Sequence, residues 1–89
     1  MAYNYNEQRS IVFSEHGQTL FLSIRDRAQK LLDSAGAFTM VKVMNAHTGS
    51  TWDMMACVDR LVELGEIREL TPPNSCAGQH RVFVAKARA

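Results

Sequence analysis

The sequence has few of the residues that mark several common classes of small protein. Its 89 residues include two cysteines, Cys57 and Cys76, whose positions match no disulfide framework, so we expect two free thiols in a reducing compartment. A zinc site needs more ligands than Cys76 and His80 can supply, and no second cysteine or histidine pair lies at finger-like spacing. We therefore expect neither a disulfide nor a bound metal.

Long apolar runs and catalytic motifs are also missing. No stretch approaches the roughly 18 to 20 apolar residues that cross a bilayer, and the opening "MAYNYNEQRS" lacks the pattern of a signal peptide. We expect one cytoplasmic domain with no membrane association. No glycine-rich phosphate loop is present, and His16, His47 and His80 fall in different predicted elements. We expect no enzymatic activity and no cofactor.

The formal net charge of +1 excludes little, but the charges are unevenly distributed. The stretch from Ser50 to Leu70 is acidic, and the stretch from Gln79 onward contains only basic charged residues (Arg81, Lys86, Arg88). A partner that carries charge of one sign would therefore meet the two regions differently.

The first helix is the clearest element. Its sequence is "TLFLSIRDRAQKLLDSAG", in which apolar residues recur at helical spacing and basic residues occupy the other, solvated face. We expect Gly17 to break the chain, Thr19 to cap the helix and Gly36 to end it. Residues 1–16 then form an N-terminal arm, in which "SIVF" is either a short strand or an apolar strap.

Two further helices follow. We expect a short helix from about Met40 to Ala46 with Thr39 as its cap, and a tight turn at "HTGS". The next helix, "TWDMMACVDRLVEL", is capped by Ser50 or Thr51, and its methionine, valine and leucine side chains face the core. Its other side exposes a second set: Trp52, Ala56, Asp59, Arg60 and Glu63, with Asp53 near the edge.

A β-hairpin is expected to complete the domain, which spans residues 17–86 and is followed by a tail of residues 87–89. Gly65 permits a left-handed turn after the helix, so that "EIRELT" forms one strand. "PPNSCAG" forms a mobile tip, and "QHRVFVAKA" returns with His80, Val82 and Val84 on one face. The predicted core lies on the apolar face of each element: Ile24, Leu31, Val58, Leu61, Ile67 and Val82.

This order of elements resembles the winged helix-turn-helix family over about Thr19 to Val84. The most specific piece is "STWDMMACVDRLVELGEIREL", which looks like the third helix and first wing strand of that family. The resemblance implies an α+β fold of three helices with a C-terminal two-stranded β-hairpin wing. It also implies a small DNA-binding protein that regulates transcription.

In that family the third helix enters the major groove and the wing contacts the backbone. The resemblance therefore places DNA-reading residues on the third helix (Thr51, Trp52, Asp53, Ala56 and Arg60). It places wing contacts on the hairpin (Asn74, Ser75, Gln79, His80 and Arg81). At the turn, Thr48 and Ser50 are expected to donate hydrogen bonds to phosphate.

The charge of this surface favours DNA less clearly, since DNA binding relies on cations that displace condensed counterions. The third helix exposes Asp53, Asp59 and Glu63 with only Arg60 opposing them. A homodimer or a basic partner domain would change that balance. The alternative is a protein-interaction module that uses Trp52 and the acidic face, unless Trp52 folds back to close the edge of the core.

Overall fold

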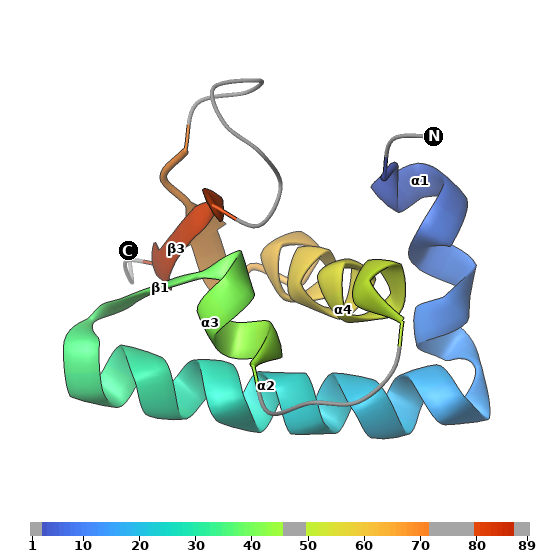
Figure 1. Cartoon of the computed structure of the whole chain (residues 1–89), viewed down its shortest axis with the longest axis horizontal. Coiled ribbons are helices and arrows are strands. Elements are labelled where there is room, and N and C mark those ends of the chain that lie inside the picture. The colour runs from blue at the N-terminus through green and yellow to red at the C-terminus, as the bar shows by residue number, and fades with distance from the viewer. Residues whose placement is uncertain (1–2, 46–49, 72–79, 87–89) are drawn as a thin grey trace.

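The computed structural model describes residues 3–45, 50–71 and 80–86, and these form an α+β fold. The helices are α1 (Tyr5–Gln8), the 3₁₀-helix η1 (Arg9–Phe13), α2 (Glu15–Ala35), α3 (Met40–Met44) and α4 (Thr51–Glu63). The strands are β1 (Ala37–Thr39), β2 (Ile67–Glu69) and β3 (Val82–Ala85). Helix α2 runs along one side of the molecule, with α3, α4 and the sheet stacked on it (Figure 1). No helix among the described residues is long and apolar enough to cross a membrane.

Helix α2 begins earlier than the sequence suggested. Ser14 is its N-cap, and the Ser14 hydroxyl accepts a hydrogen bond from the Gly17 amide at 3.0 Å. The predicted Thr19 cap and the predicted break at Gly17 were therefore wrong. Gly17 lies inside the first turn, where the backbone of η1 packs against it and leaves room only for a glycine, since a Cβ there would be 1.7 Å from the Ile11 carbonyl oxygen.

The other helix ends agree more closely with the sequence. Gly36 and Gly65 both have φ of +78°, which confirms the predicted left-handed turns after α2 and α4. The Thr39 hydroxyl accepts from the Lys42 amide at 3.3 Å, so Thr39 caps α3 as expected. Helix α3 ends at Met44, two residues before the predicted end at Ala46.

The sheet has three antiparallel strands in the order β1-β3-β2, so the predicted two-stranded hairpin was incomplete. Strand β1 pairs with β3 with Phe38 opposite Phe83, and β2 pairs with β3 with Arg68 opposite Val84. Strand β1 was not predicted, because "AFTMV" contains residues that favour a strand and residues that favour a helix in one short run. β3 is the central strand, and both of its neighbours are edge strands.

Most of the predicted core is confirmed. Ile24, Leu31, Val58, Leu61 and Ile67 are buried, and they belong to one cluster. The prediction that Val82 belongs to the core was wrong by one residue, because Val82 is only half-buried. Its neighbour Phe83 is fully buried and stacks on Phe38 with ring centroids 5.4 Å apart. Successive strand residues point to opposite faces, so Phe83 facing the helices turns Val82 away.

The residues predicted as an N-terminal arm are folded against the domain. We call α1 and η1, with Tyr3 before them, the N-terminal segment (Tyr3–Phe13). It packs on both α2 and α4, and its own Val12 side chain is buried. The apolar strap expected at "SIVF" is present as a 3₁₀-helix rather than a strand.

Candidate nucleic-acid interface

The side of α4 that was expected to read DNA is covered by the N-terminal segment. The Tyr3 hydroxyl donates to the Asp59 carboxylate at 2.6 Å, and the Tyr5 hydroxyl donates to Glu63 at 2.9 Å. The guanidinium of Arg9 also bonds Glu63, at 2.9 and 3.1 Å. The acidic residues of α4 are therefore partners of its own chain rather than free charges.

These contacts change the ionisation of the groups involved. Hydrogen bonds from Arg9, Arg60 and Tyr5 lower the pKa of Glu63 to about 2. Burial, followed by the hydrogen bond to Glu63, raises the pKa of Tyr5 to about 12. Burial and the bond to Asp59 raise the pKa of Tyr3 well above its usual range. Both tyrosines are thus held as neutral donors to carboxylates.

Aromatic contacts also hold the N-terminal segment against α4. Two guanidinium groups lie over the ring of Phe13, that of Arg9 at 4.9 Å and that of Arg60 at 5.0 Å from its centroid. Trp52 is half-buried, packs against the core and meets the Tyr3 ring edge-on at 6.3 Å. Trp52 therefore lies against other side chains, as expected if it closes the edge of the core.

Ala56 is the clearest correction on this helix. It was expected to be exposed, and its exposed fraction is 0%. Ala56 shares one side of α4 with Trp52, Asp59 and Arg60, and all three of these contact the N-terminal segment. The helix pattern correctly identified the side of α4, but it could not identify what covers that side.

Arg81, the expected phosphate contact of the wing, is already paired with two carboxylates. Its guanidinium bonds Asp59 on α4 at 2.7 Å and Glu69 on β2 at 2.8 Å. These bonds, led by the one that Arg81 donates to Glu69, raise the pKa of Arg81 against the opposing effect of its burial. Arg81, the residue directly before β3, therefore connects the start of that strand to β2 and α4, and little of its positive charge is available to a ligand.

Of the remaining expected contacts, some lie within the described residues and four do not. Ser50 and Thr51 are exposed at the start of α4, and Ser50 makes no side-chain capping bond. His80 is exposed before β3, and Asp53 is half-buried with its carboxylate 3.4 Å from the amide of Gln8. Four expected contacts lie outside the described residues: Thr48, Asn74, Ser75 and Gln79.

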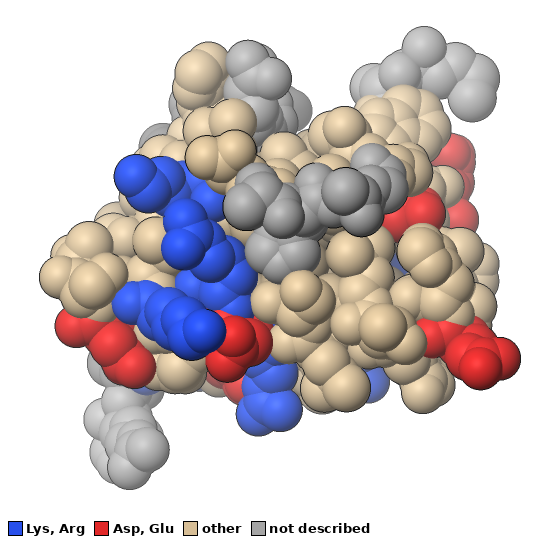
Figure 2. All heavy atoms as spheres, turned by 60° about the horizontal axis from the view of Figure 1, so that its bottom comes forward, with Lys and Arg blue, Asp and Glu red and all other residues tan. Residues whose placement is uncertain are grey.

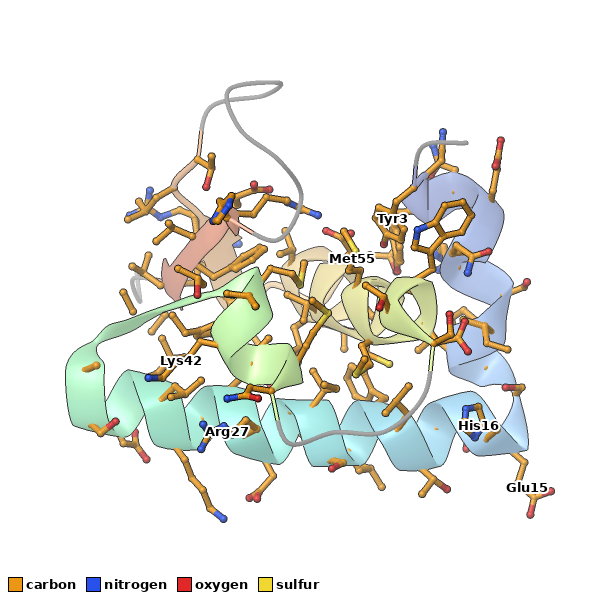
Figure 3. All side chains as sticks on the ribbon, viewed as in Figure 1. Tyr3, Glu15, His16, Arg27, Lys42 and Met55 are labelled. Atoms are coloured by element: carbon orange, nitrogen blue, oxygen red, sulfur yellow. The ribbon has the colours of Figure 1, made fainter. Side chains whose placement is uncertain are left out.

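A basic surface lies elsewhere, over α2 and α3. Arg27 and Lys30 are neighbours on α2, and Figure 3 shows Arg27 close to Lys42 of α3. Figure 2 shows a run of basic side chains on this face, with acidic side chains beside it. We call Arg27, Lys30 and Lys42 the basic band. The amphipathic pattern of α2 predicted only a solvated face for its basic residues, because it does not reveal that Lys42 lies beside that helix.

Within the band the charges are weakly compensated. Lys30 forms an ion pair with Asp26 at 3.1 Å. Both side chains are about two-thirds exposed, so solvent weakens this pair and it neutralises little of the lysine charge. Neither Arg27 nor Lys42 forms an ion pair with any described residue. The band therefore retains more usable positive charge than the wing arginine does.

No thiol or metal chemistry is supported by the described residues. Cys57 is fully buried, and burial raises the pKa of its thiol to about 12, so it is not a thiolate at neutral pH. Within the described ranges no group of three or more metal-ligating side chains comes together.

Comparison with known proteins adds no further constraint. No family model matches the chain, and searches of curated proteins and of solved structures give no significant match.

Proposed function

We propose that the chain is a winged helix-turn-helix domain that binds double-stranded DNA through the basic band and the start of α4. In this proposal α3 and α4 are the helix-turn-helix pair, and β2 and β3 are the strands of the wing. The observation that carries it is the position of Lys42 on α3 close to Arg27 on α2, with Lys30 one turn further along the same helix. A row of cations on neighbouring helices is complementary to the negative charge of a phosphate backbone.

The start of α4 supports the same orientation. Helix N-termini attract anions because their first amides are unpaired and the helix dipole is positive there. Ser50 and Thr51 are exposed at this end, and each hydroxyl is a donor for phosphate. The first helix of a helix-turn-helix pair crosses the backbone, which is the role that Lys42 on α3 would take.

The proposal differs from the family pattern in one respect. The outer side of α4 is occupied by Tyr3, Tyr5 and Arg9, so base reading along the whole of α4 would require displacing them. We therefore expect backbone binding with weak sequence preference, because phosphate contacts carry no base information. The protein-interaction alternative loses support for the same reason, since Trp52 and the acidic residues are engaged internally.

The test is the affinity for a random duplex as a function of salt concentration. Three phosphate contacts predict a slope of log affinity against log salt of roughly −3, and each lost contact should reduce its magnitude by about 1. Lys42→Gln and Lys30→Gln should each flatten the slope and weaken binding to all sequences alike.

Lys86→Gln is the matched control. Lys86 is exposed and lies near Gly65, at the junction of α4 and β2, and its loss changes the net charge by the same amount. It should leave the slope nearly unchanged. Equal effects of Lys42→Gln and Lys86→Gln, or no duplex binding at low salt, would refute the proposal.

A further inference from the structure

A second surface lies beside the basic band, at the open edge of the sheet. Leu31 and Ala35 of α2, Phe38 of β1 and Val82 of β3 line a mainly apolar groove of about 280 Å³. Lys42 of α3 also lines it and is its only charged lining residue among those described. A mainly apolar hollow with one cation suits a ligand that is apolar and carries a negative charge.

The groove follows the edge of β1, whose only partner strand is β3. The Met40 amide donates to the Arg81 carbonyl at 2.8 Å, in the same register that places Phe38 opposite Phe83. In an antiparallel pair, alternate residues direct their amide and carbonyl groups toward the partner strand. The backbone amide and carbonyl of Phe38 therefore point toward β3. The backbone groups of Ala37 and the amide of Thr39 point the other way, toward the open edge.

We propose that this edge and groove bind an extended, acidic segment of a partner protein. The segment adds a strand beside β1 through the backbone groups of Ala37, and it places an aliphatic side chain against Leu31 and Ala35. A glutamate or aspartate of the segment lies near Lys42. Main-chain pairing supplies affinity in this mode of recognition, and the side-chain pocket and the charge supply selectivity.

Charge is the argument for an acidic occupant. Lys42 lines the groove, and Arg27 and Lys30 extend the positive field along α2. Complementary charge mainly speeds encounter and excludes partners of the wrong sign. The inference does not rest on DNA binding, although the two ligands would share Lys42 and so compete for it.

The experiment uses the whole chain and a short capped peptide that alternates glutamate with leucine or valine, followed by amide shifts in NMR titrations. We expect shifts at Ala37 and Thr39, and much weaker binding when lysine replaces glutamate in the peptide. Lys42→Gln should weaken binding by up to about fivefold, as expected for the loss of one exposed ion pair. Ala35→Glu should weaken it by about tenfold or more, because it places a like charge in the apolar contact.

Ser34→Glu is the matched control, since Ser34 is exposed, adjoins Ala35 and does not line the groove. It adds the same charge to the end of α2, so any effect on DNA binding should be equal in the two variants. Only Ala35→Glu should affect the peptide beyond about twofold. Equal effects of both, no peptide binding, or a dimer of this chain that Ala35→Glu dissociates would each overturn the proposal.

Discussion

The Tyr3 hydroxyl and the Asp59 carboxylate are joined by a 2.6 Å hydrogen bond, although 56 positions separate them in the sequence. Asp59 also pairs with Arg81, so a single carboxylate connects the N-terminal segment, α4 and β3. Removing a partner from a part-buried network leaves other polar groups unsatisfied, which costs more than the bond itself contributes. The N-terminal segment is therefore part of the folded domain.

Tyrosine ionisation reports whether that segment is docked. Tyr3 and Tyr5 are the only tyrosines, and the pKa of each is raised, that of Tyr5 to about 12. An ultraviolet titration of the native protein should show almost no tyrosinate at pH 10, whereas the denatured chain should titrate near 10. Because the folded-state pKa values are raised, this contribution to stability is lost as the pH rises above 10. Ordinary titration of both tyrosines in the native protein would mean that the segment is detached.

Glu63 gives the corresponding test in acid. Its pKa is lowered from 4.5 to about 2, so its contribution to stability is complete above pH 4.5 and is lost as the pH falls toward 2. The melting temperature of Glu63→Gln should lie below that of the wild type at pH 6, and the two should converge near pH 2. The carboxyl carbon resonance of Glu63 measures the pKa directly, and a midpoint near 4.5 would exclude the contacts with Arg9, Arg60 and Tyr5.

The direction of β3 is tested by two neighbouring substitutions. Phe83 is fully buried against Phe38, so Phe83→Ala should lower the free energy of unfolding by about 3 to 5 kcal/mol. Val82 is half-buried, and Val82→Ala should cost clearly less. Denaturant unfolding of both variants measures the difference. A larger loss for Val82→Ala would restore the strand orientation that the sequence alone suggested.

Gly17 and Gly36 separate close packing from backbone strain. In Gly17→Ala the added Cβ would lie 1.7 Å from the Ile11 carbonyl oxygen, so η1 must move away from α2. In Gly36→Ala nothing lies within 4 Å, and the cost is only the left-handed backbone, about 1 kcal/mol. Gly17→Ala should therefore be the more destabilised variant, and its amide exchange should increase across η1. Equal stability of the two would argue against the packing of η1 on Gly17.

The sequence was sufficient to locate those elements whose signals are local. Gly36 and Gly65 mark left-handed turns, Thr39 caps α3, and the apolar spacing of α4 identifies its buried side. Each of these depends on residues within one or two helical turns. They support the α+β class and most of the core before any long-range contact is considered.

The features that were predicted wrongly depend on contacts between residues far apart in the sequence. Strand β1 becomes a strand only because β3 pairs with it, and Ala56 is buried on the side of α4 that the N-terminal segment covers. The pairing of Arg81 with Asp59 likewise crosses 22 positions of sequence. Periodicity within one element carries no information about such partners, so the candidate site was predicted less well than the fold.

We propose that duplex DNA contacts the basic band and the start of α4, while the N-terminal segment stays in place. The decisive measurement is an NMR titration of the whole chain with a short random duplex. We predict chemical-shift changes at Lys42, Arg27, Ser50 and Thr51, with the resonances of Tyr3 and Asp59 unchanged. Changes concentrated at Asp59, Arg60 and Glu63, with release of Tyr3, would refute the proposal and show that DNA binds the outer side of α4.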